Sequence, residues 1–246
     1  MKIFAHRGYA GKYPENTLVA FEAAAKLPVE GVELDVQRTK DGVLVVNHDE
    51  RIHRTSNGKG HLKDHTFEEL RELDFGSWKG EEFAGAKIPT LEEVLCVFQQ
   101  THHVINLEIK TDVVAYPNIE DDVLDLVNRL GMADRIMYSS FDHTMVESLL
   151  QKAPSNLVGV LFEKILVNLH EYGERIGSNS LHISMEAAKR GVIRQDIEKG
   201  SVFRVYTVNK VEDYDVMESL GVEAIFTDQP ELMYAHREKK AAKTSS

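Results

Sequence analysis

The chain has few of the features that cross-link a protein or anchor it in a membrane. It contains one cysteine, six prolines and one tryptophan in 246 residues. A single cysteine excludes an internal disulfide framework, and we expect Cys96, in the apolar stretch 91–98, to pack in the core. No apolar run approaches the roughly 20 residues that span a bilayer. Because a charge and a histidine occur within the first six residues, the apolar region of a signal peptide is also missing. These absences predict a cytoplasmic protein without stable membrane association.

Basic residues are also in the minority. Lysine and arginine number 29 against 40 acidic residues, a net charge of −11. This balance argues against nucleic acid or an anionic membrane as a partner and favours a small-molecule substrate. The length suits a single α/β barrel domain over residues 1–246, since such barrels commonly have about 250 residues. We expect the Lys-, Ala- and Ser-rich segment 238–246 to be a disordered tail.

Short β-branched segments alternate with helical patterns along the chain. The predicted strands are residues 2–6, 32–36, 104–109, 136–140, 157–162, 181–184, 202–208 and 224–227. The predicted helices are residues 17–26, 91–101, 119–130, 143–152, 167–176, 186–198, 211–220 and 231–237. Thr90 and Asp142 stand where helix N-caps are expected, as does Asn16. Eight strands, each followed by a helix, predict a closed (β/α)₈ TIM barrel of the α/β class.

One segment, residues 39–88, interrupts this alternation and is predicted to form an insertion after the second strand. It contains a further strand-like run, 43–48, separated from the second strand only by the turn at Asp41-Gly42. Such a short connection requires antiparallel pairing. Counting outward from the turn brings His48 opposite Asp35, to within a residue or two. The rest of the insertion is predicted to form a small lobe over one barrel mouth.

Polar residues collect at the ends of the first three predicted barrel strands. The first strand ends in His6 and Arg7, the second carries Glu33 and Asp35, and the third closes with Glu108 and Lys110. Barrel active sites lie at the carboxyl ends of the strands, and residues two apart on a strand share a face. The hairpin returns His48 to the same neighbourhood. We therefore expect these side chains to converge on one barrel mouth.

Three converging carboxylates repel one another unless a cation lies between them. Oxygen-only ligands suit Mg²⁺ or Ca²⁺ better than zinc, so Glu33, Asp35 and Glu108 are candidate ligands of either ion. With one divalent ion, Arg7 and Lys110 leave a single positive charge, which a phosphodiester neutralises. His6 and His48 are then free for general acid and base chemistry. The remaining histidines are predicted to have no functional role. They are His102 and His103, expected at the surface of the opposite mouth, and His53, His61, His65, His143, His170, His182 and His236.

At this point the ordered motifs resemble those of the glycerophosphodiester phosphodiesterase family. The resemblance rests on His6-Arg7-Gly8, Pro14-Glu15-Asn16-Thr17, Glu33-Leu34-Asp35, Asp41-Gly42, His48-Asp49, Arg54-Thr55 with Gly58, Glu108-Ile109-Lys110, Tyr206-Thr207-Val208-Asn209 and Thr227-Asp228-Gln229-Pro230. It covers essentially the whole chain.

The resemblance implies a TIM barrel that hydrolyses glycerophosphodiesters to sn-glycerol 3-phosphate and an alcohol. It implies metal ligation by Glu33, Asp35 and Glu108, and an acid/base pair of His6 and His48. Further substrate contacts are implied for a set of residues around the mouth: Arg7 and Lys110 at the phosphate, with supporting roles for Glu15 and Asn16. Tyr206 stands where the family often has tryptophan, so an aromatic platform remains but differs in size and polarity.

Two other functions use the same residues. A lysophospholipase D-type activity needs an apolar entrance for acyl chains. Five apolar residues of the insertion could line it, although such residues more often form the core of a lobe: Leu70, Leu73, Phe75, Trp78 and Phe83. A non-catalytic phosphoester-binding barrel is the second alternative. The sequence leaves open the head group, the native metal, the order of the two histidines, the nucleophile (water or the glycerol 2-hydroxyl) and the oligomeric state.

Overall fold

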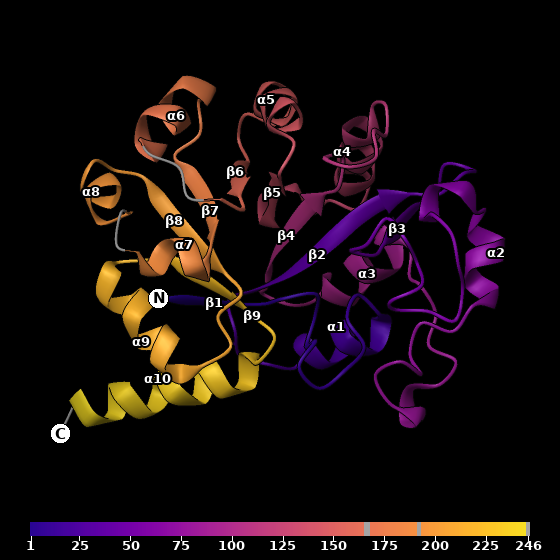
Figure 1. The fold of residues 1–246 in the computed structure, drawn as a ribbon, viewed down its shortest axis with the longest axis horizontal. Helices are drawn as coiled ribbons and strands as arrows, with labels where there is room; N and C mark the ends of the chain where they lie inside the picture. The colour runs from indigo at the N-terminus through magenta and orange to yellow at the C-terminus, as the bar shows by residue number, and fades with distance from the viewer. Residues whose placement is uncertain (165–167, 191–192, 245–246) are drawn as a thin grey trace.

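Eight parallel strands close into a barrel, as the alternation of patterns predicts. The computed structural model describes residues 1–164, 168–190 and 193–244. The barrel order is β1-β2-β4-β5-β6-β7-β8-β9, and β9 pairs with β1 to close the ring (Figure 1). These strands are β1 Lys2–Ala5, β2 Gly31–Arg38, β4 Val104–Ile109, β5 Ile136–Ser140, β6 Leu157–Phe162, β7 Ser180–Ser184, β8 Val202–Tyr206 and β9 Ala224–Thr227. The predicted TIM barrel is confirmed.

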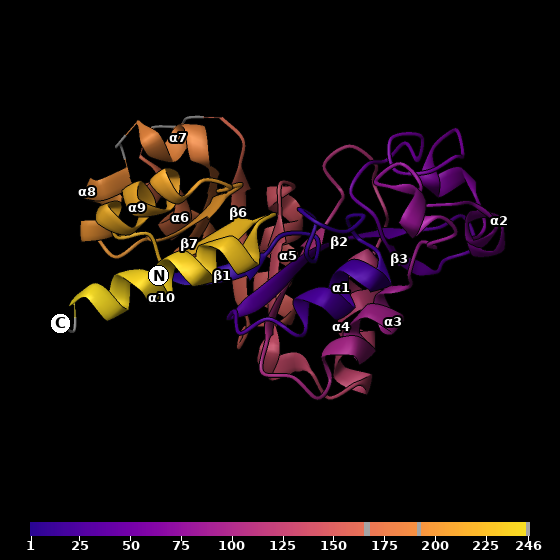
Figure 2. The ribbon, with the colours of Figure 1, turned by 90° about the horizontal axis from the view of Figure 1, so that it is seen from below.

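Helices surround the barrel on the outside (Figures 1 and 2). They are α1 Leu18–Ala24, α3 Leu91–Phe98, α4 Ile119–Arg129, α5 His143–Lys152, α6 Leu169–Ile176, α7 Met185–Lys189, α8 Ile193–Glu198, α9 Val211–Leu220 and α10 Pro230–Thr244. Within the described residues, no helix has the length and apolarity needed to cross a membrane. The barrel therefore has the usual two layers, an inner sheet and an outer ring of helices.

Several helix boundaries differ from those predicted. The helix predicted over 186–198 is two, α7 and α8, with residues 191–192 outside the described part of the chain. The predicted start of α6 at residue 167 also lies outside it. The tail expected from residue 238 is helical, because α10 continues to Thr244. Thr90 and Asp142 cap their helices as predicted. Asn16 does not, because Thr17 precedes the first residue of α1.

The inserted segment forms a hairpin and a lobe beside the barrel. Strand β3, Leu44–Val46, pairs antiparallel with β2, with Val46 opposite Val36. Beyond β3, the lobe contains the 3₁₀ turns Leu62–Asp64 and Glu81–Phe83 and the helix α2, Phe67–Glu72. It has its own small core, built around Leu70, Phe75 and Ile52. Leu70 and Phe75 therefore pack within the lobe rather than lining an entrance.

Alternate residues of the barrel strands face opposite layers. Leu34 and Leu107 are fully buried in the large core between sheet and helices, whereas Phe4, Met137 and Phe226 form a separate cluster. Because side chains alternate along a strand, Glu33 and Glu108 share the inner face with this second cluster.

Two burial predictions are wrong. Cys96 is exposed, because the buried stripe of α3 consists of residues at 91, 94, 95 and 98 and Cys96 lies off it. His103 is 1% exposed rather than at the surface, and its Nε2 lies 3.1 Å from the Leu27 carbonyl oxygen.

Candidate active site

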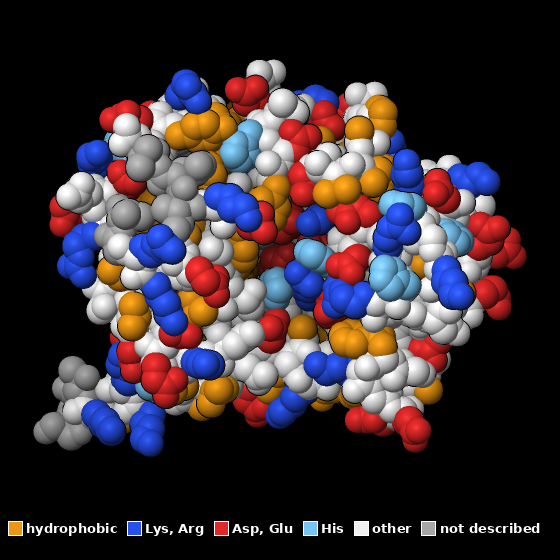
Figure 3. All heavy atoms as spheres, in the orientation of Figure 1, with side chains coloured by type: hydrophobic (Ala, Val, Ile, Leu, Met, Phe, Trp, Pro, Cys, Tyr) orange, Lys and Arg blue, Asp and Glu red, His pale blue; other side chains and the backbone are white. Residues whose placement is uncertain are grey.

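Three buried carboxylates lie together at the carboxyl ends of β2 and β4. One oxygen each of Glu33, Asp35 and Glu108 lies within 4.8 Å of the others. The parallel register places Asp35 beside Glu108, and none of the three is more than 9% exposed. Figure 3 shows acidic side chains at the bottom of a hollow in the middle of one face, with histidine and basic side chains at its rim.

The surroundings of the three carboxyls raise the pKa of two of them and lower the pKa of the third. Burial raises the pKa of Glu33 well above its usual value, and the neighbouring charges of Asp35 and Glu108 add to the effect. Burial also raises the pKa of Glu108, although Lys110 opposes it. Burial works against ionisation of Asp35 too, but the charges of His48, Arg7 and Lys110 lower its pKa to about 2. Oxygen ligands that are this crowded and buried fit a hard divalent cation, which would neutralise them.

His6 follows the last residue of β1 and lies at the edge of the carboxylate cluster. Its Nδ1 is 2.7 Å from Oδ1 of Asp228, and its Nε2 is 3.9 Å from Oε2 of Glu33. Asn209 holds the Asp228 carboxylate from the other side, with its Nδ2 donating at 2.7 Å. A carboxylate acceptor at Nδ1 keeps the proton there, which leaves Nε2 as the nitrogen that faces the cluster.

His48 reaches the site from the hairpin. The backbone N–H of Asn47 donates to the Asp35 carbonyl oxygen at 3.0 Å, so the predicted register is correct to within one residue. Nδ1 of His48 lies 2.7 Å from Oδ1 of Asp49. Each histidine is therefore paired with its own aspartate.

Arg54, in the lobe, holds two of the supporting carboxylates at once. Its Nε donates to Asp49 at 2.6 Å, and its Nη2 donates to Glu15 at 2.7 Å. Glu15 in turn accepts from Nη1 of Arg7 at 2.8 Å. The side chains beside His48 and beside Arg7 are thus connected through one guanidinium.

Arg7 and Asn16 are two of the four described residues other than glycine that have positive φ, with values of 53° and 56°. This conformation turns Arg7 so that its backbone N–H donates to Glu33 at 2.9 Å and its Nε lies 3.4 Å from Asp35. The backbone N–H of Asn16 donates to the Arg7 carbonyl at 3.0 Å, and its side chain donates to Asp35 at 2.8 Å. Asn16 therefore supports a carboxylate, not a helix end.

Lys110 and Tyr206 lie on the far side of the cluster. Nζ of Lys110 donates to Glu108 at 3.1 Å and lies 5.6 Å from the centre of the Phe141 ring. The Tyr206 ring contacts Phe141 edge-on at 6.0 Å, and its hydroxyl donates to the Phe162 carbonyl at 2.7 Å. That bond fixes the ring of Tyr206 as a wall of the pocket.

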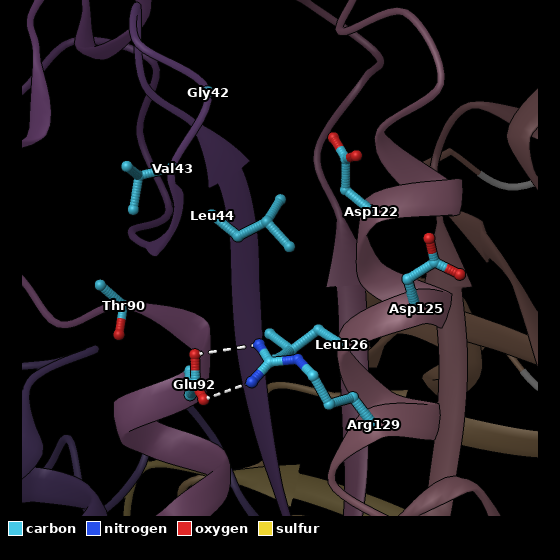
Figure 4. Close-up of a pocket in the computed structure, with 9 residues that line it drawn as sticks. All are labelled: Gly42, Val43, Leu44, Thr90, Glu92, Asp122, Asp125, Leu126 and Arg129. Carbon is cyan, nitrogen blue, oxygen red and sulfur yellow. Dashed lines mark hydrogen bonds and ion pairs between the residues drawn. The ribbon is translucent and has the colours of Figure 1, made fainter.

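A pocket of about 100 Å³ connects these groups. Its lining includes both histidines, Arg7, Glu33 and Glu108, and it continues into the barrel as far as Asn106, Leu161, His182 and Phe226. A larger, more open cleft of about 400 Å³ lies elsewhere, between the hairpin, α3 and α4 (Figure 4). Arg129 and Glu92 form an ion pair of 2.9 Å across it. Its lining shares no residue with the pocket at the carboxylate cluster and includes no histidine.

The structure therefore brings together every predicted site residue: His6, His48, Glu33, Asp35, Glu108, Arg7, Lys110, Glu15, Asn16 and Tyr206. The sequence predicts no role for Asp228, Asp49 or Arg54. All three belong to motifs that carry the family resemblance, and the charges of Asp49 and Arg54 beside a predicted histidine and carboxylate could have suggested pairing. His182, for which no functional role is predicted, also lines the pocket.

The fold and this site define a class of protein, the TIM-barrel phosphodiesterases. Residues 6–232 match the family described as "Glycerophosphoryl diester phosphodiesterase family", and the chain belongs to this family. It is 39% identical over 243 residues to "Glycerophosphodiester phosphodiesterase" of Bacillus altitudinis, covering 97% of this chain and 98% of that one. It is 38% identical to the Caldanaerobacter subterraneus subsp. tengcongensis protein of the same name, covering 94% and 95%.

Solved structures of similar proteins have the same fold over nearly the whole chain. A phosphodiesterase of Oleispira antarctica, determined in complex with the product sn-glycerol-3-phosphate, has a TM-score of 0.85 and 27% identity, covering 97% of each chain. A glycerophosphodiester phosphodiesterase of Agrobacterium tumefaciens has a TM-score of 0.81 and 30% identity, covering 96% of this chain and 99% of that one.

Proposed function

We propose that this protein hydrolyses glycerophosphodiesters, such as glycerophosphocholine and glycerophosphoethanolamine, to sn-glycerol 3-phosphate and an alcohol, with the help of a divalent cation. The observation that carries the proposal is the buried cluster of Glu33, Asp35 and Glu108 beside two histidines that each have an aspartate partner. The names of the relatives and the product bound to the Oleispira antarctica enzyme support the choice of substrate. A cytoplasmic location stays a prediction.

The three carboxylates would hold Mg²⁺ or Ca²⁺, which as a Lewis acid withdraws charge from the phosphoryl oxygens. Arg7 and Lys110 supply the positive charge that this chain itself offers to the phosphate. Each is already tied to a carboxylate, Arg7 to Glu15 and Lys110 to Glu108. These contacts orient the two cations before substrate arrives, so that they stabilise charge on the transition state without reorganising.

The two histidines would carry the proton transfers. With Nδ1 donating to Asp228 in His6 and to Asp49 in His48, the free Nε2 of each ring exchanges protons at the pocket. We assign His6 as the base that deprotonates the nucleophile and His48 as the acid that protonates the leaving alkoxide. The nucleophile is water or the neighbouring 2-hydroxyl of glycerol, which has the advantage of proximity. Attack by the 2-hydroxyl would give a cyclic phosphate, and water would then break its bond to that hydroxyl oxygen to give sn-glycerol 3-phosphate.

An acyl-chain substrate is less well supported. Of the apolar lobe residues that could line a lipid entrance, Leu70 and Phe75 are buried in the lobe core. Trp78 is 39% exposed, and its Nε1 donates to the Phe75 carbonyl. Activity on lysophosphatidylcholine compared with glycerophosphocholine separates the two substrates.

The test is release of sn-glycerol 3-phosphate from glycerophosphocholine by metal-stripped protein, with and without added Mg²⁺ or Ca²⁺. We expect release only with metal, and loss of most of kcat in His6→Ala and in His48→Ala. His170→Ala is the matched control. His170 lies on α6, its Nδ1 is 2.9 Å from Oγ of Ser201, and it does not line the pocket. Folded protein that is inactive with every divalent ion would refute the proposal. A cyclic glycerophosphate trapped during turnover identifies the 2-hydroxyl as nucleophile.

A further inference from the structure

The segment that carries His48 lies beyond the end of its strand. Strand β3 runs along β2 (Figure 1) and ends at Val46, and residues 47–49 continue the chain without regular structure. The Asn47 N–H still donates to the Asp35 carbonyl on β2. The carbonyl groups that follow need other partners, because a buried backbone group without a hydrogen bond costs free energy. Strand pairing alone therefore does not hold the backbone at His48.

Gln37 supplies these partners. It lies on β2 two residues after Asp35, and it is 0% exposed. Its Nε2 donates to the carbonyl oxygens of residues 47, 48 and 49 at 2.8, 3.1 and 3.0 Å. An amide has two N–H groups, so the three contacts share two protons. One buried side chain thus holds the backbone of His48 and of its partner Asp49.

Tyr116 determines which end of the Gln37 amide faces these carbonyls. Its hydroxyl donates to Oε1 of Gln37 at 3.0 Å, and the residue is 7% exposed. Burial raises the pKa of Tyr116, so the hydroxyl keeps the proton that it donates. An amide oxygen only accepts and an amide nitrogen only donates. Because the oxygen is bound to Tyr116, the N–H groups turn to the hairpin, and the loop between β4 and α4 is connected to the segment of His48.

The position of this segment matters for proton transfer. Nδ1 of His48 lies 2.7 Å from Oδ1 of Asp49, and both side chains leave a backbone whose carbonyls share one donor. Loss of that donor leaves three carbonyl groups to find new partners, and their movement displaces the ring together with its aspartate. A displacement of about 1 Å caused by a residue outside the chemistry can cost about 100-fold in rate. Arg7 and Lys110, which follow β1 and β4, do not depend on this segment.

We propose that Gln37 and Tyr116 are positioning residues for His48, which they hold through the backbone of residues 47–49. The assignment rests on the proposed function, in which His48 transfers a proton. Neither residue lines the pocket, so their effect is on the geometry of the histidine and not on contact with the substrate. We therefore expect their loss to change kcat rather than KM.

The test measures kcat and KM for glycerophosphocholine with metal-loaded protein. Gln37→Met keeps the length of the side chain without its donors, and it is expected to lower kcat about 10–100-fold with KM within about twofold of wild type. Asn156→Leu is the matched control. Nδ2 of Asn156 also donates to two backbone carbonyls, those of Ala133 at 2.8 Å and Ile136 at 2.9 Å, but Asn156 does not line the pocket. Both variants should lower Tm, and only Gln37→Met should lower kcat.

Tyr116→Phe is the second variant, which removes only a hydroxyl. It should lower kcat about 3–10-fold, the equivalent of one hydrogen bond. It should cause no further loss in the Gln37→Met background, because Tyr116 acts through Gln37. A normal kcat in either single variant, a loss of the same size in Asn156→Leu, or independent losses in the double variant overturns the assignment.

The proposed function fails in a different way, by absence of glycerophosphocholine hydrolysis in the folded wild type. Positioning can then be measured without turnover, from the nitrogen NMR signals of the histidine rings. Gln37→Met should shift the signals of His48 and leave those of His6, whose partner is Asp228, unchanged. Unchanged signals of His48 overturn the assignment.

Discussion

The sharpest prediction concerns Glu33, whose ionisation opposes folding when no cation is bound. Its oxygen lies within 4.8 Å of those of Asp35 and Glu108. Two unit charges at that distance repel by about 3.5 kcal/mol at an effective dielectric constant near 20. Glu33→Gln removes two such repulsions but also loses the attraction of Arg7, while the amide oxygen can still accept from the Arg7 N–H. We expect the metal-free variant to be more stable than metal-free wild type at pH 7, by about 1–3 kcal/mol.

Metal addition should stabilise the wild type much more than the Glu33→Gln variant. At 100 times the dissociation constant, a ligand that binds only the folded state stabilises it by about 2.7 kcal/mol. In a chain of this size each kcal/mol raises Tm by about 2–4 °C, so the wild type should gain roughly 5–11 °C. Glu33→Gln should gain little, since it has lost one of three ligands. Calorimetry or CD melting with and without Mg²⁺ and Ca²⁺ measures both effects.

The pH dependence follows from the directions of the pKa shifts. Glu33 has a raised pKa in the folded protein, so its contribution to stability is complete below its unfolded pKa, near 4.3, and is lost as the pH rises through its folded value. Asp35, with a pKa of about 2, contributes stability above about 3.9 that is lost as the pH falls toward 2. The benefit of metal should therefore be larger at pH 7 than at pH 5.

A matched control is Glu120→Gln. Glu120 is a buried carboxylate on α4 that accepts from Ser148 and Lys152 at 2.8 and 2.9 Å, outside the cluster. This variant should lose stability, because its carboxylate has a favourable partner, and should keep the full metal effect. A Glu33→Gln protein that is less stable than wild type without metal, and that still gains the full increase in Tm, would show that the reasoning is wrong.

Three further predictions concern the supporting residues. Arg54→Gln should lower kcat because Asp49 and Glu15 lose their shared donor. We expect a loss of about 10–100-fold, the range for residues that orient catalytic groups. The control is Arg51→Gln, at an exposed arginine, which should leave steady-state kinetics unchanged. Asp228→Asn should cost a similar factor in kcat with little change in KM, since His6 loses its Nδ1 acceptor; a normal kcat would count against this. Leu70→Ala should lower the free energy of unfolding by about 2–5 kcal/mol in denaturant titrations, and a loss under 1 kcal/mol would mean that the lobe core contributes little.

The barrel and the candidate cluster could be predicted because both depend on local patterns. Alternation of strands and helices determines the architecture, and strand parity places Glu33 and Asp35 on one face of the second strand. Glu108 joins them because active-site residues of a barrel gather at the carboxyl ends of its strands. The hairpin is also predictable from local sequence, since a short turn allows only antiparallel pairing. Counting residues outward from that turn then places His48 near Asp35.

What could not be predicted depends on contacts between distant parts of the chain or on burial in three dimensions. His6 and Asp228 are 222 residues apart, and only closure of the barrel by β9 and β1 brings them together. Asn16 looked like a helix cap because asparagine favours that position, yet its left-handed backbone turns the side chain to Asp35 instead. His182 gave no signal because its place in the pocket lining depends on which strand face points into the barrel. Cys96 is different, since the spacing of the apolar residues around it already placed it off the buried stripe.

The hairpin also decides where this chain can change in length. Val46 pairs with Val36, and the turn between them is closed by the Gly42 N–H donating to Thr39. Removing one residue from this turn would shift the pairing by one and point the next side chain, rather than His48, at the cluster. After His48, the chain forms a lobe with its own core, and at the end of this lobe Thr90 pairs with Val45 of β3. We therefore expect insertions and deletions to be tolerated in the lobe beyond Arg54, but not between residues 39 and 47, so that the lobe can diverge while the few residues before it must keep their number.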